Sequence, residues 1–295
     1  MSNKPLNTEP PPGSTHGSSL TRFQRVGALL LILLSLPAAV LAAPGDLDPS
    51  FDGDGRVLTD FGGFDRPFDV VRQPDGKLVA AGVSFINGSE DFSLARYHPD
   101  GSLDTEFGVL GRTVTDLGGN DGVFALVVEP DGKLVAAGFS NSGGIPVFAL
   151  ARYRPDGSLD PGFGNGGVVL DAVGGIAFSS SLVRQPDGKL VAAGTSANSA
   201  TAPPSLDLAL ARYNPDGSLD RSFGADGHAF LPLPTTAEAA FGLAIQLDNK
   251  LVATGPTNLQ FPNGNLGPAD FLIARFNSDG SLESFDTLLL SPHQQ

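Results

Sequence analysis

The sequence predicts an all-β protein, a β-propeller of about four four-stranded antiparallel blades. Three observations predict it. The chain of 295 residues holds 38 Gly and 24 Pro with 17% charged residues, a composition typical of short strands joined by turns. The segment PDGKLVAAG starts at Pro74, Pro130 and Pro186, and returns as LDNKLVATG at Leu247. The strand-like run that ends each unit is largely apolar on both of its faces.

A repeat of about 60 residues sets the domain organisation. Its landmark, LDxxF, occurs at Leu47, Leu103, Leu159 and Leu219, and a degraded copy, LESF, occurs at Leu282. We therefore expect a polar leader and signal peptide over 1–42 and a β-propeller-like domain over 43–295. The expected repeats lie near 47–102, 103–158, 159–218 and 219–281, with a partial start over 282–295.

Each repeat contains four strand-like runs, which in the first repeat are Arg56–Asp60, Phe68–Gln73, Lys77–Ser84 and Phe92–Tyr97. Asp75-Gly76 separates the second run from the third. Asp-Gly between apolar runs is a strong hairpin signal, because glycine accepts the positive φ of a tight turn. Neighbouring strands are therefore expected to be antiparallel.

The same Asp-Gly turn recurs along the chain. Its aspartates are Asp75, Asp131 and Asp187, which we expect to be structural positions of the repeat. The fourth repeat has Asn249 in place of the glycine. Asparagine is the next best residue at positive φ, so a turn is expected there as well.

Side-chain alternation in the last run favours stacked sheets. Both faces of this run are largely apolar: one carries Phe92, Leu94 and Arg96, and the other carries Ser93, Ala95 and Tyr97. A lone sheet with one wet face would alternate apolar and polar residues. Burial on both faces indicates a sheet packed between two like sheets, as in a propeller. A parallel β-helix is the alternative, although its coils are much shorter than this repeat and lack internal Asp-Gly hairpins.

The N-terminal segment has the layout of a secretory signal peptide. The apolar run VGALLLILLSL, residues 26–36, follows Arg22 and Arg25 and is ended by Pro37. Small residues precede a cleavage position after Ala42. An exported protein, periplasmic or secreted, is the expectation, and an uncleaved anchor over 26–43 is the alternative route to a membrane.

Charge and cysteine content exclude several classes of function. The net charge is −14 at pH 7, so the chain repels phosphate backbones, and nucleic-acid binding is not expected. The sequence has no cysteine, which excludes disulfides, thiol nucleophiles and thiolate metal sites.

The linked motifs LDxxFGxxG, QPDGKLVAAG and DFxLARYxPDGSLD resemble the delta-60 repeat family of bacterial exported proteins. The resemblance covers about residues 47–282. It implies a β-propeller-like domain and carries over no catalytic residue. The fourth repeat departs most from the pattern, with LDNK at Leu247 in place of PDGK and Asn277-Ser278 in place of Asn-Pro.

One arginine and one aromatic residue recur at the end of every repeat. They are Arg96, Arg152, Arg212 and Arg275, followed by Tyr97, Tyr153, Tyr213 and Phe276. We expect each arginine to pair with an aspartate of the LD landmark or of the PDG turn, and each tyrosine to pack between blades, since buried charges need partners. A ring of basic groups that holds an anion is the alternative.

Two further features are candidate sites. Asp52 and Asp54 lie in DGDG, which looks like a fragment of a calcium loop, although ordinary turn use is the competing interpretation. No other cofactor is expected. The connection Pro256–Asp270 is long and nearly uncharged, and loops on a rigid scaffold carry most binding. Its candidate ligand-binding residues are Leu259, Phe261, Asn263, Asn265 and Asp270.

No catalytic residue is predicted. His98 and His228 occupy unrelated positions of the repeat, and no nucleophile-elbow, zinc or phosphate-loop motif occurs. The expected function is an exported, non-catalytic binding or interaction scaffold for an unknown macromolecule or glycan. The alternative is a propeller-type hydrolase or lyase that acts on an extracellular or envelope polymer. Self-association is a third expectation, in which the segment Leu282–Leu290 supplies a closing strand.

Overall fold

A computed structural model of the chain describes residues 45–198, 205–231, 238–257 and 270–283. All regular elements in these ranges are β-strands, fifteen in all, joined by turns. The predicted leader and signal peptide lie outside the described residues. No helix among the described residues has the length and apolar character needed to cross a membrane.

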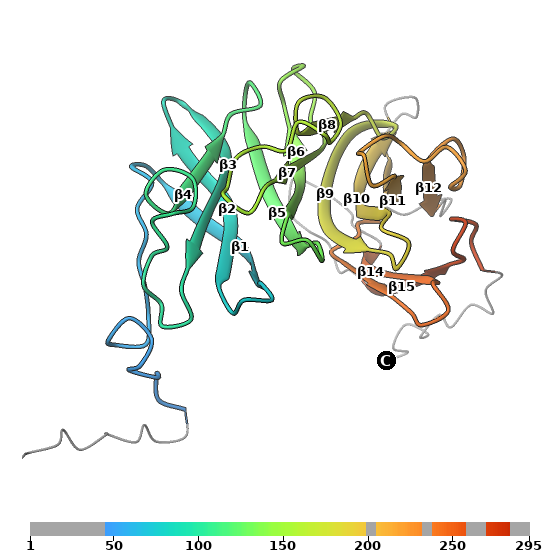
Figure 1. Cartoon of the computed structure of the whole chain (residues 1–295). Coiled ribbons are helices and arrows are strands. Elements are labelled where there is room, and N and C mark those ends of the chain that lie inside the picture. Colours follow the sequence, from blue (N-terminus) through green and yellow to red (C-terminus); the bar gives the residue numbers. More distant parts are fainter. Residues whose placement is uncertain (1–44, 199–204, 232–237, 258–269, 284–295) are drawn as a thin grey trace, which may run out of the picture. The chain divides into compact units, whose positions relative to one another are not determined.

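The strands form four antiparallel sheets in chain order (Figure 1). The first sheet contains β1 (Asp65–Arg72), β2 (Leu78–Ile86), β3 (Ser89–Tyr97) and β4 (Arg112–Thr115). The second contains β5 (Asp121–Val128), β6 (Leu134–Ser140), β7 (Val147–Tyr153) and β8 (Val168–Asp171). The third contains β9 (Gly175–Arg184), β10 (Leu190–Asn198), β11 (Ser205–Tyr213) and β12 (His228–Leu231). The fourth has three described strands, β13 (Gly242–Ile245), β14 (Leu251–Thr257) and β15 (Asp270–Phe276). The predicted class, an all-β propeller-like array of four antiparallel sheets, is confirmed.

The sheets pack face to face within the unit Pro44–Gln295. Strand β5 contacts β1, β2 and β3, strand β9 contacts β5, β6 and β7, and β13 contacts β9. One apolar cluster fills each joint between neighbouring sheets. The inner sheets are therefore buried on both faces, as the apolar character of both sides of the last run in each repeat indicates.

Each of the first three sheets takes its fourth strand from the following repeat. In the first sheet, Phe92 of β3 lies opposite Thr115 of β4, and Ala95 lies opposite Arg112. The boundary between repeats, when set at the LD landmark, therefore falls before the last strand of the sheet. The run Arg56–Asp60, expected as a strand, is not one, because no described strand lies beside it to accept its backbone hydrogen bonds.

The Asp-Gly turns have the conformation that the sequence predicts. Gly76 has a φ of 90°, and Asn249 at the same place in the fourth repeat has a φ of 64°. The glycine that ends LVAAG has a different role. A Cβ on Gly138 would overlap the carbonyl oxygen of Gly122, where a bulge pushes β5 against β6. Glycine is required there by the close approach of two backbones.

Candidate functional site

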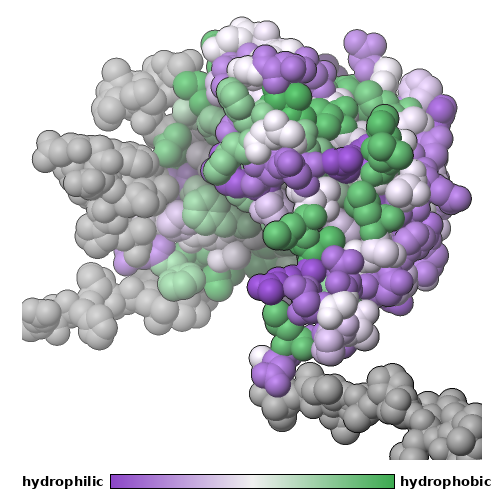
Figure 2. All heavy atoms as spheres, turned by 90° about the vertical axis from the view of Figure 1, so that its left-hand side faces the viewer, coloured by the Kyte–Doolittle hydropathy of each residue, from purple (hydrophilic) through white to green (hydrophobic). Residues whose placement is uncertain are grey.

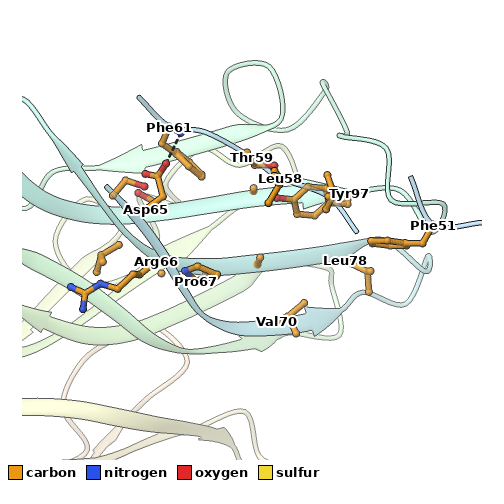
Figure 3. A pocket seen from close by; sticks show the side chains of 18 residues that line it. Phe51, Leu58, Thr59, Phe61, Asp65, Arg66, Pro67, Val70, Leu78 and Tyr97 are labelled. Carbon is orange, nitrogen blue, oxygen red and sulfur yellow. Dashed lines mark hydrogen bonds between the residues drawn. The ribbon is translucent and has the colours of Figure 1, made fainter. Parts of the chain in front are cut away.

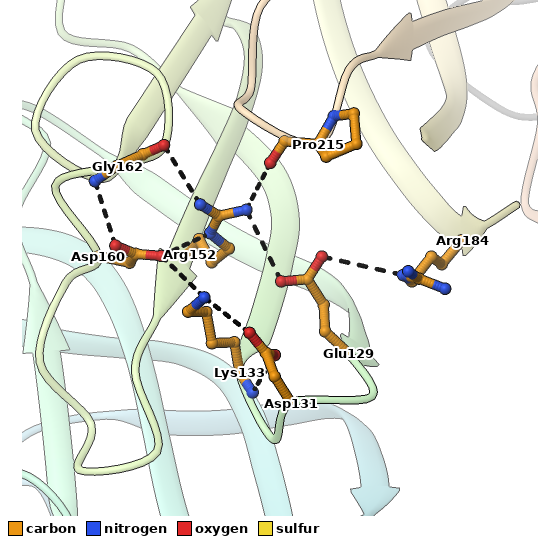
Figure 4. A network of polar contacts seen from close by, with 8 residues as sticks. All are labelled: Glu129, Asp131, Lys133, Arg152, Asp160, Gly162, Arg184 and Pro215. Carbon is orange, nitrogen blue, oxygen red and sulfur yellow. Dashed lines mark hydrogen bonds and ion pairs between the residues drawn. The ribbon is translucent and has the colours of Figure 1, made fainter. Parts of the chain in front are cut away.

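The arginine of each repeat lies in a network of charges at the edge that carries the PDG turns (Figure 4). Arg152 is 7% exposed and lies at the end of β7. Its Nε donates to Asp160 Oδ2 at 2.9 Å, and its Nη1 donates to the carbonyl oxygen of Pro215, in the next repeat, at 2.5 Å. The guanidinium carbon lies 4.6 Å from the centre of the Phe163 ring. Arg152 thus joins two repeats.

This arrangement repeats in the chain. Equivalent sets are Arg96–Asp104–Pro155 and Arg212–Asp220–Ser278. In the last sheet Arg275 pairs with Glu283, but its side chain is 46% exposed. The exposure of Arg275 follows from its place on the last described sheet, since no sheet among the described residues follows it and offers a carbonyl oxygen.

Lysines complete the network. The distance from Lys77 Nζ to Asp104 Oδ2 is 2.9 Å. Burial opposes ionisation of Asp104, but hydrogen bonds from Lys77 and Arg96 outweigh it and lower the pKa of this carboxyl group to about 2. The side chain of Asp104 is 2% exposed, so solvent screens these interactions weakly. The basic groups at this edge are therefore occupied by carboxylates and carbonyls of the protein itself.

The tyrosines fasten each sheet to the sheet before it. Tyr153 is fully buried, and its hydroxyl donates to Thr115 Oγ1 of β4 at 2.9 Å. Tyr213 donates to Asp171 of β8 in the same way at 2.8 Å. Tyr97 donates to Thr59 at 2.7 Å, although Thr59 belongs to no strand.

An acidic cluster lies at the opposite edge of the first joint. Ligand oxygens of Asp91, Asp116 and Asp121 lie within 4.8 Å of one another. Asp91 is near the start of β3, Asp121 begins β5, and Asp116 directly follows β4. Asp91 and Asp121 are buried, whereas Asp116 is exposed. The cluster therefore brings together two repeats and opens to solvent on one side.

Burial and mutual repulsion make ionisation of the carboxylates in this cluster less favourable. Burial raises the pKa of Asp121, and the neighbouring charge of Asp116 adds to the effect. Burial likewise raises the pKa of Asp91. The backbone N–H of Leu117 donates to Asp121 Oδ2 at 2.8 Å. Hydrogen bonds from Ser140 and from the backbone of Asn141 also stabilise the ionised carboxylate, but burial outweighs them. Three carboxylates in this arrangement are the oxygen ligands that Ca²⁺ prefers.

The residues predicted from the sequence as metal ligands lie elsewhere. Asp52 and Asp54 are exposed, and Asp54 forms an ion pair with Arg56 at 3.0 Å. Asp52 has a φ of 48°, and its backbone N–H donates to the carbonyl oxygen of Asp100 at 2.6 Å. Both are used in a turn and in local pairing. Calcium at these two residues stays a prediction.

The cluster of Asp91, Asp116 and Asp121 does not follow from the sequence, because these residues occupy three different positions of the repeat. Asp116 and Asp121 lie in TDLGGND, which the sequence shows as a turn. Their approach to Asp91 depends on the transfer of β4 to the preceding sheet. The acidic pair Asp116 and Asp121, five residues apart around Gly-Gly, is the signal in the sequence.

The predicted ligand-binding loop falls largely outside the described residues. Leu259, Phe261, Asn263 and Asn265 are among those left undescribed. Asp270 begins β15 and is exposed. The two described histidines both lie beside carboxylates: His98 Nε2 is 3.7 Å from Asp104, and His228 Nε2 is 2.9 Å from Asp171.

Comparison with known proteins identifies the repeat. Residues 73–107, 129–163, 185–223 and 246–285, together about half of the chain, match the family described as "Domain of unknown function (DUF5122) beta-propeller". The chain belongs to this family. The four matched segments each span from the PDG turn past the LD landmark, the part of the repeat that holds the arginine network. The β-propeller-like repeat implied by the resemblance is confirmed, while the delta-60 name stays a prediction. No curated protein matches the chain.

Several solved structures resemble this member of the DUF5122 family. A protein of unknown function from Dyadobacter fermentans DSM 18053 has a TM-score of 0.50 and 11% identity, over 77% of this chain and 70% of that chain. An endo-arabinase from Bacteroides thetaiotaomicron VPI-5482 has a TM-score of 0.45 and 14% identity, over 78% of this chain and 80% of that chain. An endo-1,5-alpha-L-arabinanase from Thermotoga petrophila RKU-1 has a TM-score of 0.39 and 15% identity, over 74% of this chain and 59% of that chain. The first likeness shows a shared fold.

Proposed function

We propose that this protein is an exported, non-catalytic binding scaffold whose ligand meets the edge of the sheets that carries the acidic cluster. The supporting observation is a difference between the two edges. The PDG edge is the same in the first three repeats and changes only at a few positions in the fourth. At the other edge, the connections between the second and third strands differ in length: they span residues 87–88, 141–146, 199–204 and 258–269. Variation on a constant scaffold is typical of binding surfaces.

The paired charges favour a scaffold over the alternative, a hydrolase or lyase. Arg152 and Asp160 neutralise each other, as do Arg96 and Asp104. An enzyme requires a general acid or base within reach of its substrate. The charged groups that recur in the repeat are instead used to hold neighbouring repeats together.

A loop replacement tests the proposal. Residues 258–269 are replaced by Asn-Gly, the two-residue connection that the first repeat uses at residues 87–88. The probes are an array of envelope and plant oligosaccharides and a set of purified envelope proteins. We expect the wild-type chain to bind a member of these sets, and the replacement to lose that binding with an unchanged Tm. Retained binding, or release of reducing ends from the bound oligosaccharide, would contradict the proposal.

The same scaffold is proposed to take Ca²⁺ at Asp91, Asp116 and Asp121. The support is the geometry of the three carboxylates, which come from two repeats, have oxygens within 4.8 Å of one another and include two buried groups, Asp91 and Asp121. A cation that binds only the folded state increases the free energy of unfolding, by about 2.7 kcal/mol at a hundredfold excess over Kd, and so raises Tm. We expect CaCl₂ to raise the Tm of the wild type and of Asp54→Asn but not of Asp121→Asn. An equal rise in all three would place the ion elsewhere.

A further inference from the structure

The first sheet exposes side chains that are buried in every inner joint. Val70 of β1 is 61% exposed. Its counterparts in the next two sheets, set by the register of β1, β5 and β9 with their neighbours, are Leu126 at 4% and Leu182 at 6%. The preceding sheet covers Leu126 and Leu182. No described sheet precedes β1, so Val70 faces solvent.

The last sheet exposes the opposite half of the same interface. Phe271 and Ile273 of β15 are 94% and 65% exposed. Their counterparts in the first sheet, Phe92 and Leu94, are both fully buried against the second sheet. The two end faces therefore carry complementary halves of one repeated interface.

A cavity of about 380 Å³ lies on the outer face of the first sheet, where the apolar side chains of a preceding sheet would pack (Figure 3). It is lined by Pro67, Val70, Leu78 and Tyr97, among others. Their counterparts in the next sheet are Val123, Leu126, Leu134 and Tyr153, which form one apolar cluster with Phe92 and Leu94. The cavity is thus the space that two apolar side chains of a preceding sheet would fill. Figure 2 views this side of the molecule and shows hydrophobic residues between hydrophilic ones.

The segment Arg56–Asp60 lies on the same face in the position of a fourth strand. Its counterpart is β4, whose Thr115 accepts from Tyr153 as Thr59 accepts from Tyr97. Arg112 Nη1 also donates to the carbonyl oxygen of Asp60. Yet Arg56–Asp60 pairs with no described strand, and β15 has no described fourth strand beside it. One end of the array therefore has a segment in the position of a fourth strand, Arg56–Asp60, with no sheet to join. The other end has a sheet, β13–β15, with no described fourth strand.

We propose that these two ends join between two copies of this chain, head to tail. The sheet β13–β15 of one copy packs on the first sheet of the other, and Arg56–Asp60 pairs with β15. The register of β3 with β4 places Leu272 opposite Leu58 and Phe271 opposite Thr59. Two such joints close a ring of eight sheets, which lies within the four to eight blades of known propellers. The inference stands independently of the proposed ligand.

A polar contact supports a second copy as the occupant. Arg96, Arg152 and Arg212 each donate to a carbonyl oxygen of the next repeat, and Arg275 has no described partner of that kind. The equivalent acceptor at the head of the array is the carbonyl oxygen of Pro99, which corresponds to that of Pro155. The joint therefore supplies Arg275 with the contact that the other three arginines make.

Single cysteines test the joint between copies, since the chain has none of its own. Full chains carrying Leu58→Cys and Leu272→Cys, with tags of different mass, are mixed under mild oxidation. Directly opposed strand positions have the Cβ separation that a disulfide accepts. We expect a mixed disulfide dimer at a yield at least tenfold above that of Val114→Cys with Leu272→Cys. Val114 is the matched control, because it corresponds to Leu58 in β4 and already pairs with β3.

Other occupants of the open edge give different results. Closure of one chain on itself, or pairing of β15 with residues 284–295 of its own chain, yields no mixed dimer and overturns the proposal. Phe271→Asp introduced into the Leu272→Cys chain should lower the yield at least tenfold. Ile145→Asp, which changes an exposed residue of the connection between β6 and β7, should not lower it. Equal yields from both would show that the disulfide forms by random collision and would also overturn it.

Discussion

At the scale of single residues, the arginine of each repeat is a structural residue. Arg152 reaches a carboxylate of the following LD landmark and a carbonyl oxygen one repeat further on. The sequence predicts a partner among the landmark or turn aspartates, because a charge on a strand buried on both faces needs one. The carbonyl oxygen of Pro215 could not be predicted, since it comes from the neighbouring sheet.

Removing this guanidinium should destabilise the fold strongly. Arg152→Ala leaves Asp160 with one cationic partner among the described residues, Lys133 at 3.6 Å, and with the backbone N–H of Gly162 at 3.1 Å. We expect a loss of about 3–5 kcal/mol in the free energy of unfolding. The control is Arg221→Ala. Arg221 is an exposed residue paired with Asp226, and the change should leave stability unchanged. Urea titration measures both, and similar small losses would show that the buried network contributes little.

The lowered pKa of Asp104 predicts a dependence of stability on pH. Its folded pKa of about 2 lies below the ordinary value near 4, so the stabilisation is complete above pH 4 and is lost as the pH falls toward 2. We expect Asp104→Asn to cost about 2 kcal/mol at pH 7 and progressively less below pH 4. Free energies of unfolding of the wild type and of Asp104→Asn at pH 7, 5 and 3 measure this cost. A cost that does not change with pH would assign the effect to packing.

The ionised carboxylate of Asp121 should lower the stability of the folded state, in contrast to that of Asp104. Burial raises its folded pKa, so its ionisation destabilises the folded state, and this penalty grows as the pH rises from the ordinary value through the raised one. In the absence of Ca²⁺ we expect Asp121→Asn to be more stable than the wild type at pH 7 and not at pH 4. Asn keeps the oxygen that accepts from Leu117. Thermal unfolding of both proteins at pH 7 and pH 4, with a chelator present, measures this difference in stability. An equal difference at the two pH values would contradict the prediction.

At the scale of elements, the hairpin between the first two strands of each sheet follows from local sequence. Asp-Gly at Asp75-Gly76 predicts the turn, and the lone Asn249 keeps it with a φ of 64°. The position of the fourth strand could not be predicted, because the LD landmark does not show that the run after it joins the preceding sheet. That same transfer creates the acidic cluster, which is why the sequence predicts calcium at Asp52 and Asp54 instead.

The glycine of LVAAG should tolerate no side chain. A Cβ on Gly138 would meet the backbone at Gly122, so we expect Gly138→Ala to cost about 1–3 kcal/mol. Gly143, in the connection between β6 and β7, is the matched control, because nothing lies within 4 Å of its added Cβ. Gly143→Ala should leave Tm unchanged. Equal Tm values for the two variants would contradict the close approach at the bulge.

At the scale of the whole molecule, one repeated joint explains both the constant and the exposed features. The arginine and the apolar residues Phe92 and Leu94 of β3 are buried where a following sheet covers them, and their counterparts Arg275 and Phe271 are exposed on the last described sheet. The repeat in the sequence predicts stacked sheets. It does not show which residues form the two end faces, because these residues match those buried in the inner joints.

The molar mass in solution tests this account most directly. Light scattering from the full chain, 30.3 kDa, is measured across a range of protein concentrations at 0.5 M NaCl. High salt screens the repulsion between copies that each carry a net charge of −14. We expect the mass to rise to that of two chains and Phe271→Asp to remain at one. A single-chain mass for the wild type at every concentration would contradict the account.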